Sequence, residues 1–420
     1  MKTTAKILLL LLVSAVLFIQ CEKEVPHIKI PDNHFQNALI EAGIDTDGDG
    51  QISHMEAEAV TSLRVSGDSI TDLTGIEKFI NLDTLICSSN QLTSLDVSQI
   101  NSLVYLGCSH NDLTSLDVSN NTLLRYLGCI YNPLTNLDLS NNYDLTALYL
   151  EGCSLTSLNL TNQTELITLT CGWNQLTGLD VSNNTKLEKL QCSSNQITAL
   201  NLSGNPALDY LLCNANPLLT LDISENTALT ILDCAGDQLS GLDITANTKL
   251  EHLDCSFNQL TDLDISMNSL LEFLECGSNQ LTSLDISNNT SLNTLYALGN
   301  QLTSLDLSLN AELEWLDCSV NQLSILDFPV NNAIFYLRCM ENQITSIDVS
   351  NCSSLKYLYC DYNQLTSLDV SNNNALYHLY LTYMPSLEKV CVWELPFPPE
   401  SVYLDTTGSP NVYFTTDCSR

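Results

Sequence analysis

The chain has 420 residues and a strongly acidic balance, with 49 aspartate and glutamate residues against 14 lysine and arginine residues and a formal charge of −35. Such a surface repels phosphate backbones and anionic lipid headgroups, so nucleic acid is excluded as a partner. The charge fits an extracellular protein. It leaves open whether the carboxylates bind cations or only keep the chain in solution.

Residues 1–20 are predicted to be a signal peptide. Two lysines precede an apolar run over residues 7–19, which is too short to span a bilayer. Cys21 follows directly, and a cysteine at this junction resembles the lipobox of bacterial lipoproteins. That resemblance implies a lipidated Cys21, a tether over residues 21–31 and an exported protein on the bacterial outer membrane, exposed at the surface and held only by its lipid anchor.

Residues 45–56 match the calcium-binding loop of EF-hands at each ligand position, and without a cation the loop's aspartates would repel one another. The expected calcium ligands are Asp45, Asp47, Asp49, the carbonyl of Gln51, Ser53 and Glu56. Calcium sensors pair such loops and dockerin modules carry two, whereas this chain has one. We therefore expect a structural ion in an N-terminal cap over residues 32–81, which begins with a short helix and ends in a divergent first repeat.

From Leu82 the frame L-x-x-L-x-C-x-x-N-x-L-T-x-L-D-x-S-x-N-x-x recurs every 21 residues, in fourteen copies over residues 82–375. A fixed period of this length predicts a solenoid, in which each unit buries its apolar face against its neighbours. The alternating apolar residues of the first half predict a short strand, and the second half forms a weaker apolar segment on the opposite side.

One position of the frame holds most of the cysteines. Leu150 and Ala297 fill this position in two copies, which identifies it as core and predicts a buried ladder of reduced thiols rather than metal thiolates. The twelve cysteines are Cys87, Cys108, Cys129, Cys171, Cys192, Cys213, Cys234, Cys255, Cys276, Cys318, Cys339 and Cys360.

Two polar columns accompany the leucines. The asparagine after the strand, as at Asn258, is expected to bond backbone groups of the adjacent turn, with Cys153 and Asp237 as the exceptions. The aspartate of the second half, as at Asp264, either accepts local backbone N–H bonds or forms a cation-binding row. Asn159 and Asn201 replace this aspartate in two units, which favours the structural interpretation.

This frame resembles leucine-rich repeats, and the 21-residue form with cysteine in the strand is similar to the internalin J type. The resemblance implies a right-handed, curved α/β-type horseshoe with few helices. Short parallel strands would form its concave face, and turns would form its convex face.

On the strand face the outward positions vary between units, and most of the aromatic residues lie there. Tyrosine suits strand surfaces in general, but a cluster at the C-terminal end is typical of a binding surface. The candidate ligand-binding residues are Phe273, Trp315, Tyr336, Tyr357, Tyr359, Tyr362, Tyr380 and Tyr383. Upstream, Asp233, Asp254, Glu275 and Asp317 form an acidic strip at one outward position.

Residues 376–420 form a partial repeat and a C-terminal cap, because the prolines after Met384 cannot continue the ladder. Cys391 and Cys418 lie outside the cysteine column in an exported chain, which predicts a disulfide.

No hydrolase, zinc, kinase or phosphate-loop motif accompanies the repeat, so no enzyme activity is expected. The sequence favours a surface adhesion protein that binds a protein or a glycan. The alternative is a structural envelope or matrix protein that associates with itself; the oligomeric state is not predicted.

Overall fold

The computed structural model describes residues 26–328 and 333–418. The expected signal peptide and the lipidation site at Cys21 lie outside these residues. Within the described part, no helix is both long enough and apolar enough to cross a membrane. Contacts divide the chain into two compact units, one ending at Asn142 and the other beginning at Tyr143. The division falls beside the repeat in which Cys153 replaces the asparagine of the frame.

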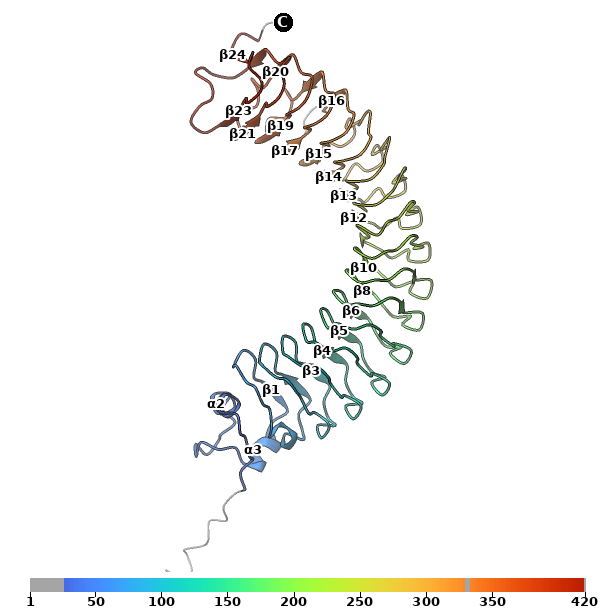
Figure 1. Ribbon diagram of the computed structural model, residues 1–420, viewed down its shortest axis with the longest axis vertical. Helices are drawn as coiled ribbons and strands as arrows, with labels where there is room; N and C mark the ends of the chain where they lie inside the picture. The colour runs from blue at the N-terminus through green and yellow to red at the C-terminus, as the bar shows by residue number, and fades with distance from the viewer. Residues whose placement is uncertain (1–25, 329–332, 419–420) are drawn as a thin grey trace, which may run out of the picture. The chain divides into compact units, whose positions relative to one another are not determined.

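The N-terminal unit begins with the cap and continues into parallel strands (Figure 1). Its helices are α2 (Asn33–Glu41), α3 (His54–Ala59) and the 3-10 helix η1 (Ile76–Lys78), and its strands are β1 (Ser62–Arg64), β2 (Thr84–Ile86), β3 (Tyr105–Gly107) and β4 (Tyr126–Gly128). The strands pair in chain order, and β1 pairs with β2 as the divergent first repeat predicts.

Asp32 connects the cap helix to the first coil. One oxygen of its carboxylate accepts the N–H of His34 at 2.7 Å, which caps α2. The other oxygen accepts the N–H and the hydroxyl of Thr71 at 2.8 and 2.7 Å. Burial alone would raise its pKa, but the bonds from Thr71, Phe35 and His34 lower the pKa of Asp32 to about 2.

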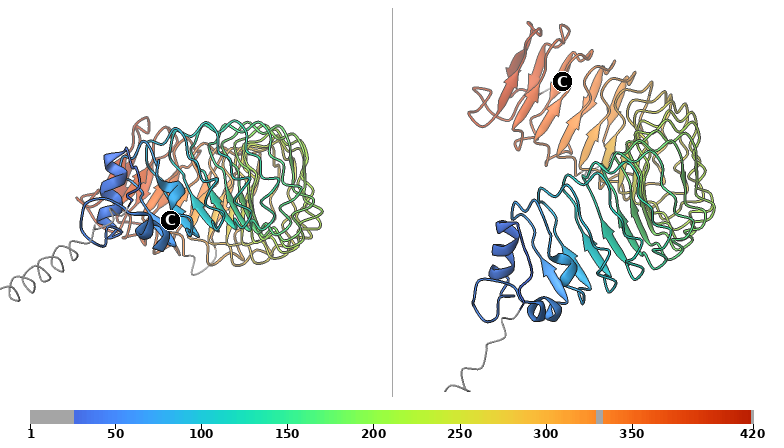
Figure 2. Two further views of the ribbon diagram at one scale, coloured as in Figure 1. Left: turned by 90° about the horizontal axis from the view of Figure 1, so that it is seen from below. Right: turned by 60° about the horizontal axis from the view of Figure 1, so that its bottom comes forward.

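In the C-terminal unit the strands form ladders in which each strand lies beside its sequence neighbours (Figure 2). The main sheet contains β5 (Ala147–Tyr149), β6 (Thr168–Thr170), β8 (Lys189–Gln191), β10 (Tyr210–Leu212), β11 (Ile231–Asp233), β12 (His252–Asp254), β13 (Phe273–Glu275), β14 (Thr294–Tyr296), β15 (Trp315–Asp317), β17 (Tyr336–Arg338), β19 (Tyr357–Tyr359), β21 (His378–Tyr380) and β23 (Tyr403–Asp405). Its pairing is parallel throughout.

Shorter ladders lie in the second half of the repeats. They are β7 (Leu179–Asp180) with β9 (Leu200–Asn201), β16 (Ile325–Asp327) with β18 (Ser346–Asp348), and β20 (Ser367–Asp369) with β22 (Lys389–Cys391) and β24 (Tyr413–Thr415). The predicted solenoid of short parallel strands is confirmed. The expectation that the prolines after Met384 end the ladder is wrong, because β22, β23 and β24 follow them and continue the pairing. The prolines lie in the connections between these strands, where no ladder N–H is needed.

The strands of the main sheet from β1 to β21 bury their central residue, and most of them expose both flanking residues in part, as in β12 around Leu253. The cysteine column is buried beneath these strands, and each of the fourteen free cysteines in the described residues is buried. Burial raises the pKa of Cys192 and of Cys276 to about 12, so both stay as thiols. The ladder therefore serves as core, as its apolar replacements predict.

The asparagine after each strand forms hydrogen bonds with the backbone groups at the bend of the coil. The amide of Asn279 donates to the carbonyls of Cys255 and Cys276 at 3.0 and 3.1 Å, and its oxygen accepts the N–H of Leu260 at 3.0 Å. Asn258 makes equivalent bonds to Cys234 and Cys255. This confirms the predicted backbone-bonding role of the column.

A second buried asparagine column occupies the end of the repeat frame, and we did not predict its role. Asn268 shows the pattern: its amide donates to the carbonyls of Ile244 at 3.1 Å and of Asn247 at 2.8 Å. The fully buried members are Asn121, Asn142, Asn184, Asn205, Asn226, Asn247, Asn268, Asn289, Asn310 and Asn373. The recurrence of asparagine at this position of the frame is the sequence signal from which the column could have been predicted.

The aspartate column has the structural role that the two asparagine replacements favour. The carboxylate of Asp264 accepts the N–H of Ser266 at 2.9 Å, and hydrogen bonds from this serine lower the pKa of Asp264. The amide oxygen of Asn201 accepts the N–H of Ser203 at 3.1 Å in the same way. Each side chain closes a local turn, which either residue type can do.

Candidate ligand-binding face and calcium loop

The aspartates of the expected calcium loop lie close together. Asp45, Asp47 and Asp49 each offer a carboxylate oxygen, and these oxygens lie within 4.8 Å of one another. The loop backbone holds all three, because Gly50 donates to Asp45 at 2.9 Å, Asp49 donates to Asp47 at 3.1 Å and Gln51 donates to Asp49 at 2.8 Å. The donor chemistry of this cluster fits a hard cation such as calcium, which prefers oxygen ligands.

Glu56 is held by other groups of the loop. Its Oε1 accepts the N–H and the hydroxyl of Thr46 at 2.6 and 2.7 Å, and its Oε2 accepts the N–H of Ser53 at 2.8 Å. Ser53 in turn caps α3 by accepting the N–H of Glu56. Burial alone would raise the pKa of Glu56, but these hydrogen bonds lower this pKa to about 2. Glu56 and Ser53 thus form a capping box at the end of the loop.

A continuous aromatic row crosses the outward face of the C-terminal unit at the third repeat position. Trp315 stacks on Tyr336 with ring centroids 4.9 Å apart, and Tyr336 lies 5.7 Å from Tyr357. Tyr357 stacks on His378 at 5.4 Å, and His378 lies 5.5 Å from Tyr403. Rings on neighbouring strands cover one another, which leaves most of them half-buried.

Two further stacks lie beside the row and line one groove. Tyr359 stacks on Tyr380 at 4.8 Å, and Tyr362 stacks on Tyr383 at 4.6 Å. The groove has a volume of about 510 Å³, and we call it the aromatic groove; it is lined by Arg338, Met340, Tyr359, Asp361, Tyr362, Tyr380, Thr382, Tyr383, Asp405 and Thr407. Seven of the eight predicted ligand-binding residues therefore lie in the row or in the groove.

Tyr362 and Tyr383 adopt a backbone conformation that bulky residues rarely take. Their φ angles are 54° and 53°, in the left-handed region, and both side chains are about half exposed. All fourteen repeats have a left-handed residue at this position, and glycine supplies it at Gly152, Gly236 and Gly299. The conformation is therefore a regular feature of the coil, which Trp173 and Phe257 share. Tyr362 and Tyr383 differ from those two residues in that their rings stack on each other beside the aromatic row.

Phe273, the eighth predicted residue, lies outside this cluster. It stacks on His252 at 4.1 Å and meets Tyr296 edge-on at 5.9 Å. Conversely, His378 and Tyr403 belong to the row although the sequence did not indicate them. His378 occupies the third repeat position, but a search of that position for tyrosine, tryptophan and phenylalanine does not find a histidine. Tyr403 follows the break in the frame, where counting by 21 residues no longer locates the third position.

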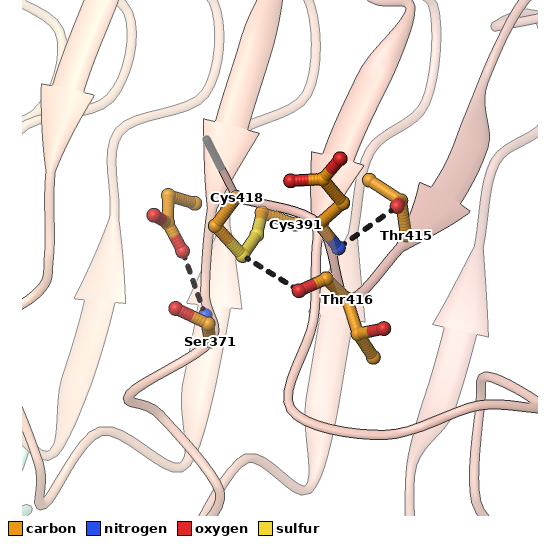
Figure 3. Close-up of a disulfide and its surroundings, with 7 residues drawn as sticks. Ser371, Cys391, Thr415, Thr416 and Cys418 are labelled. Atoms are coloured by element: carbon orange, nitrogen blue, oxygen red, sulfur yellow. Dashed lines mark hydrogen bonds between the residues drawn. A yellow bond between two sulfur atoms is a disulfide. The ribbon is translucent and has the colours of Figure 1, made fainter. Parts of the chain in front are cut away.

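The C-terminal cap is closed by a disulfide between Cys391 on β22 and Cys418, with their Cα atoms 5.6 Å apart (Figure 3). Near it, the N–H of Asp417 donates to the hydroxyl of Thr415 at 3.0 Å. The disulfide fixes the last described residues against the short ladder of β20, β22 and β24.

The parallel coils and the cysteine ladder define the class: this chain is a leucine-rich-repeat protein. Within that class it is similar to the functional domain of internalin J from Listeria monocytogenes, whose structure is described as including a cysteine ladder. The two are 36% identical, with a TM-score of 0.74, over 88% of this chain and 78% of that one. The chain belongs to the cysteine-ladder leucine-rich-repeat proteins of the internalin J type.

Other similarities are more distant or shorter. An internalin from Listeria monocytogenes strain 4b F2365 is 26% identical over 70% of this chain and 91% of that one, with a TM-score of 0.67. YopM from Yersinia enterocolitica is 27% identical over 86% and 76%, with a TM-score of 0.65. Among curated proteins, internalin J of that Listeria strain is 39% identical over 69 residues, which span 7% of its length. No protein-family model matches the chain.

Proposed function

We propose that the protein is a surface-anchored binding protein that recognises a protein partner through the aromatic groove and the adjoining aromatic row. The main support for this proposal is that the rings are adjacent. Seven aromatic residues that the sequence analysis selected lie on one face, beside or in a groove of about 510 Å³. Leucines already supply the core, so folding does not require these rings. Tyrosine, tryptophan and arginine dominate the energetics of protein interfaces.

A glycan is the alternative ligand, because flat stacked rings also suit sugar rings. The stacked, half-exposed rings of Tyr362 and Tyr383 support a binding role for either ligand class. Thr382 and Asp361 supply polar groups between the ring stacks, and Asp361 accepts the N–H of Thr382 at 2.8 Å. Such a combination gives apolar contact area together with orienting hydrogen bonds.

In this proposal Cys21 carries the lipid, and residues 21–31 separate the repeats from the membrane. The support is the apolar leader that ends directly before Cys21. Calcium is proposed as a structural ion held by Asp45, Asp47 and Asp49, with the carbonyl of Gln51 as a further oxygen ligand. The ion would neutralise the three carboxylates between α2 and α3.

The first test is a partner screen with soluble residues 22–420, probed in calcium against surface-protein extracts and a glycan array. The variant Trp315→Ala/Tyr336→Ala/Tyr357→Ala removes the aromatic row. The matched control, Trp173→Ala/Phe257→Ala, removes two exposed rings outside the row and the groove. We expect a protein hit that the row variant loses by at least about tenfold in affinity and the control retains, with similar melting temperatures.

A hit that both variants retain would move the site to another surface. A hit only on the glycan array would replace the protein partner with a sugar. No hit at all, together with oligomers seen by sizing, would favour the self-associating structural role.

A further inference from the structure

On strands β11, β12 and β13 the outward face combines an aromatic stack with a row of carboxylates. His252 and Phe273 stack at 4.1 Å with their planes 5° apart. Beside them, two residues further along each strand, Asp233, Asp254 and Glu275 lie opposite one another in register. Because neighbouring strands lie about 4.8 Å apart, this arrangement stacks three like charges on a half-buried surface.

These carboxylates lack a compensating charge of this chain. Within residues 26–328 and 333–418, the recorded ion pairs involve other residues. Burial, together with the charge of Asp254, raises the pKa of Asp233 to about 6, and the same two causes raise the pKa of Glu275. On the other side of the ring stack, Glu251 and Glu272 add exposed carboxylates.

Further along the same face, the chain's own cations show how such a surface is neutralised. Arg338 occupies the carboxylate position of the row on β17, where its guanidinium lies 3.3 Å from Asp317 and 5.8 Å from the ring centroid of Tyr359. Asp317, expected on the exposed acidic strip, is consequently buried against Arg338. Lys356 similarly lies 4.9 Å over the ring of Phe335. Arg338 thus places a cation between a carboxylate and a ring, and Lys356 places one over a ring alone.

We propose that the face of β11–β13 binds an extended, arginine-bearing segment of a protein partner, with guanidinium groups between the Asp233–Asp254–Glu275 row and the His252–Phe273 stack. This inference rests on the proposed binding function of the sheet face and adds the chemistry of the ligand. Two features of the face select that ligand: carboxylates flank the rings on both sides, and the protein's negative charge steers basic partners towards it.

The probe is a short synthetic peptide of alternating arginine and glycine, compared with the same peptide carrying neutral citrulline in place of arginine. The test variant is Asp233→Asn/Asp254→Asn/Glu275→Gln, which keeps side-chain shape and removes three charges. The control is Asp222→Asn/Asp243→Asn/Asp264→Asn, which removes the same charge at positions where Asn159 and Asn201 occur naturally.

We expect calorimetry at low salt to show binding of the arginine peptide to the wild type and to the control. The test variant should bind at least about tenfold more weakly, and the citrulline peptide should bind no variant measurably. Equal affinity of the two triple variants, or equal affinity for the two peptides, would overturn the inference.

The partner screen keeps this outcome separate from the proposed function. Suppose that the arginine peptide does not bind, but that the screen finds a partner whose binding the Trp315/Tyr336/Tyr357 variant loses. This result would refute the arginine-bearing ligand and leave the proposed binding function intact. A partner whose binding depends on the three carboxylates and on arginine would support both.

Discussion

Asp237 stands where most other repeats have asparagine. It is fully buried and accepts the N–H of Asn216 at 2.7 Å, and the thiol of Cys213 lies 3.6 Å from its second oxygen. Burial raises the pKa of Asp237 from 3.8 to about 8, so the folded protein holds a proton that the unfolded chain releases near pH 4. This residue therefore links the stability of the central repeats to pH.

Asp237→Asn should stabilise the protein by at least about 1 kcal/mol near pH 8, because an amide restores the donor of the column and needs no proton. The folded state binds the extra proton, so the contribution of Asp237 to stability is most favourable below its unfolded pKa of 3.8 and becomes less favourable as the pH rises towards 8. Denaturant unfolding of both proteins across this range measures the difference, and Asp222→Asn serves as an exposed control. Parallel pH profiles for wild type and variant would contradict the assignment.

At the scale of the coil, two asparagine columns hold successive turns, and they differ in how many bonds each side chain makes. Asn279 donates to three carbonyls, the third being that of Gly277 at 3.3 Å, and accepts one N–H, whereas Asn268 donates to two carbonyls. The first column therefore fixes both the donors and the acceptors of the bend after the strand. The second column supplies only donors to the opposite bend.

Asn279→Ala should consequently cost more stability than Asn268→Ala. A buried group left without a partner costs about 1–3 kcal/mol, and the first change strands more backbone groups than the second. Urea unfolding of the two single variants gives the comparison. Equal losses would mean that the oxygen of Asn279 contributes nothing measurable to the bend.

At the scale of the whole molecule, the N-terminal unit carries the proposed calcium loop, while all three tryptophans (Trp173, Trp315 and Trp393) lie in the C-terminal unit. In solenoids, stability is approximately a sum of local repeat terms and nearest-neighbour terms. An ion bound in the cap should therefore stabilise the coils near it first.

Calcium should raise the opening free energy of the cap, measured by hydrogen exchange at residues 32–81, by about 2.7 kcal/mol at a hundredfold excess over Kd. Tryptophan fluorescence, which reports the other unit, should shift less. The variant Asp45→Asn/Asp47→Asn should abolish the response. A calcium effect of the same size in this variant would place the ion elsewhere.

The 21-residue frame predicts the coil, the thiol ladder and the face on which the rings lie, because each depends on a local, repeated pattern. The frame could not reveal that Asp32 bonds Thr71, a contact between segments 39 residues apart. Nor could it reveal that Thr46 and Ser53 hold Glu56, because a ligand motif fixes residue types and not side-chain rotamers. Tyr403 was missed for a related reason: the prolines before it change the spacing on which the prediction relies.

The pairing register has a consequence for how such a chain can change length. From β10 to β21 each strand of the main sheet lies opposite the residue one whole period away, as Phe273 lies opposite Thr294. Unequal recombination that deletes or duplicates one unit there would leave every ladder bond with an equivalent partner. Loss of a single residue would instead turn the leucines of that coil towards solvent. Such a gene can therefore lengthen or shorten the strand face in steps of one coil, while the two caps stay unchanged.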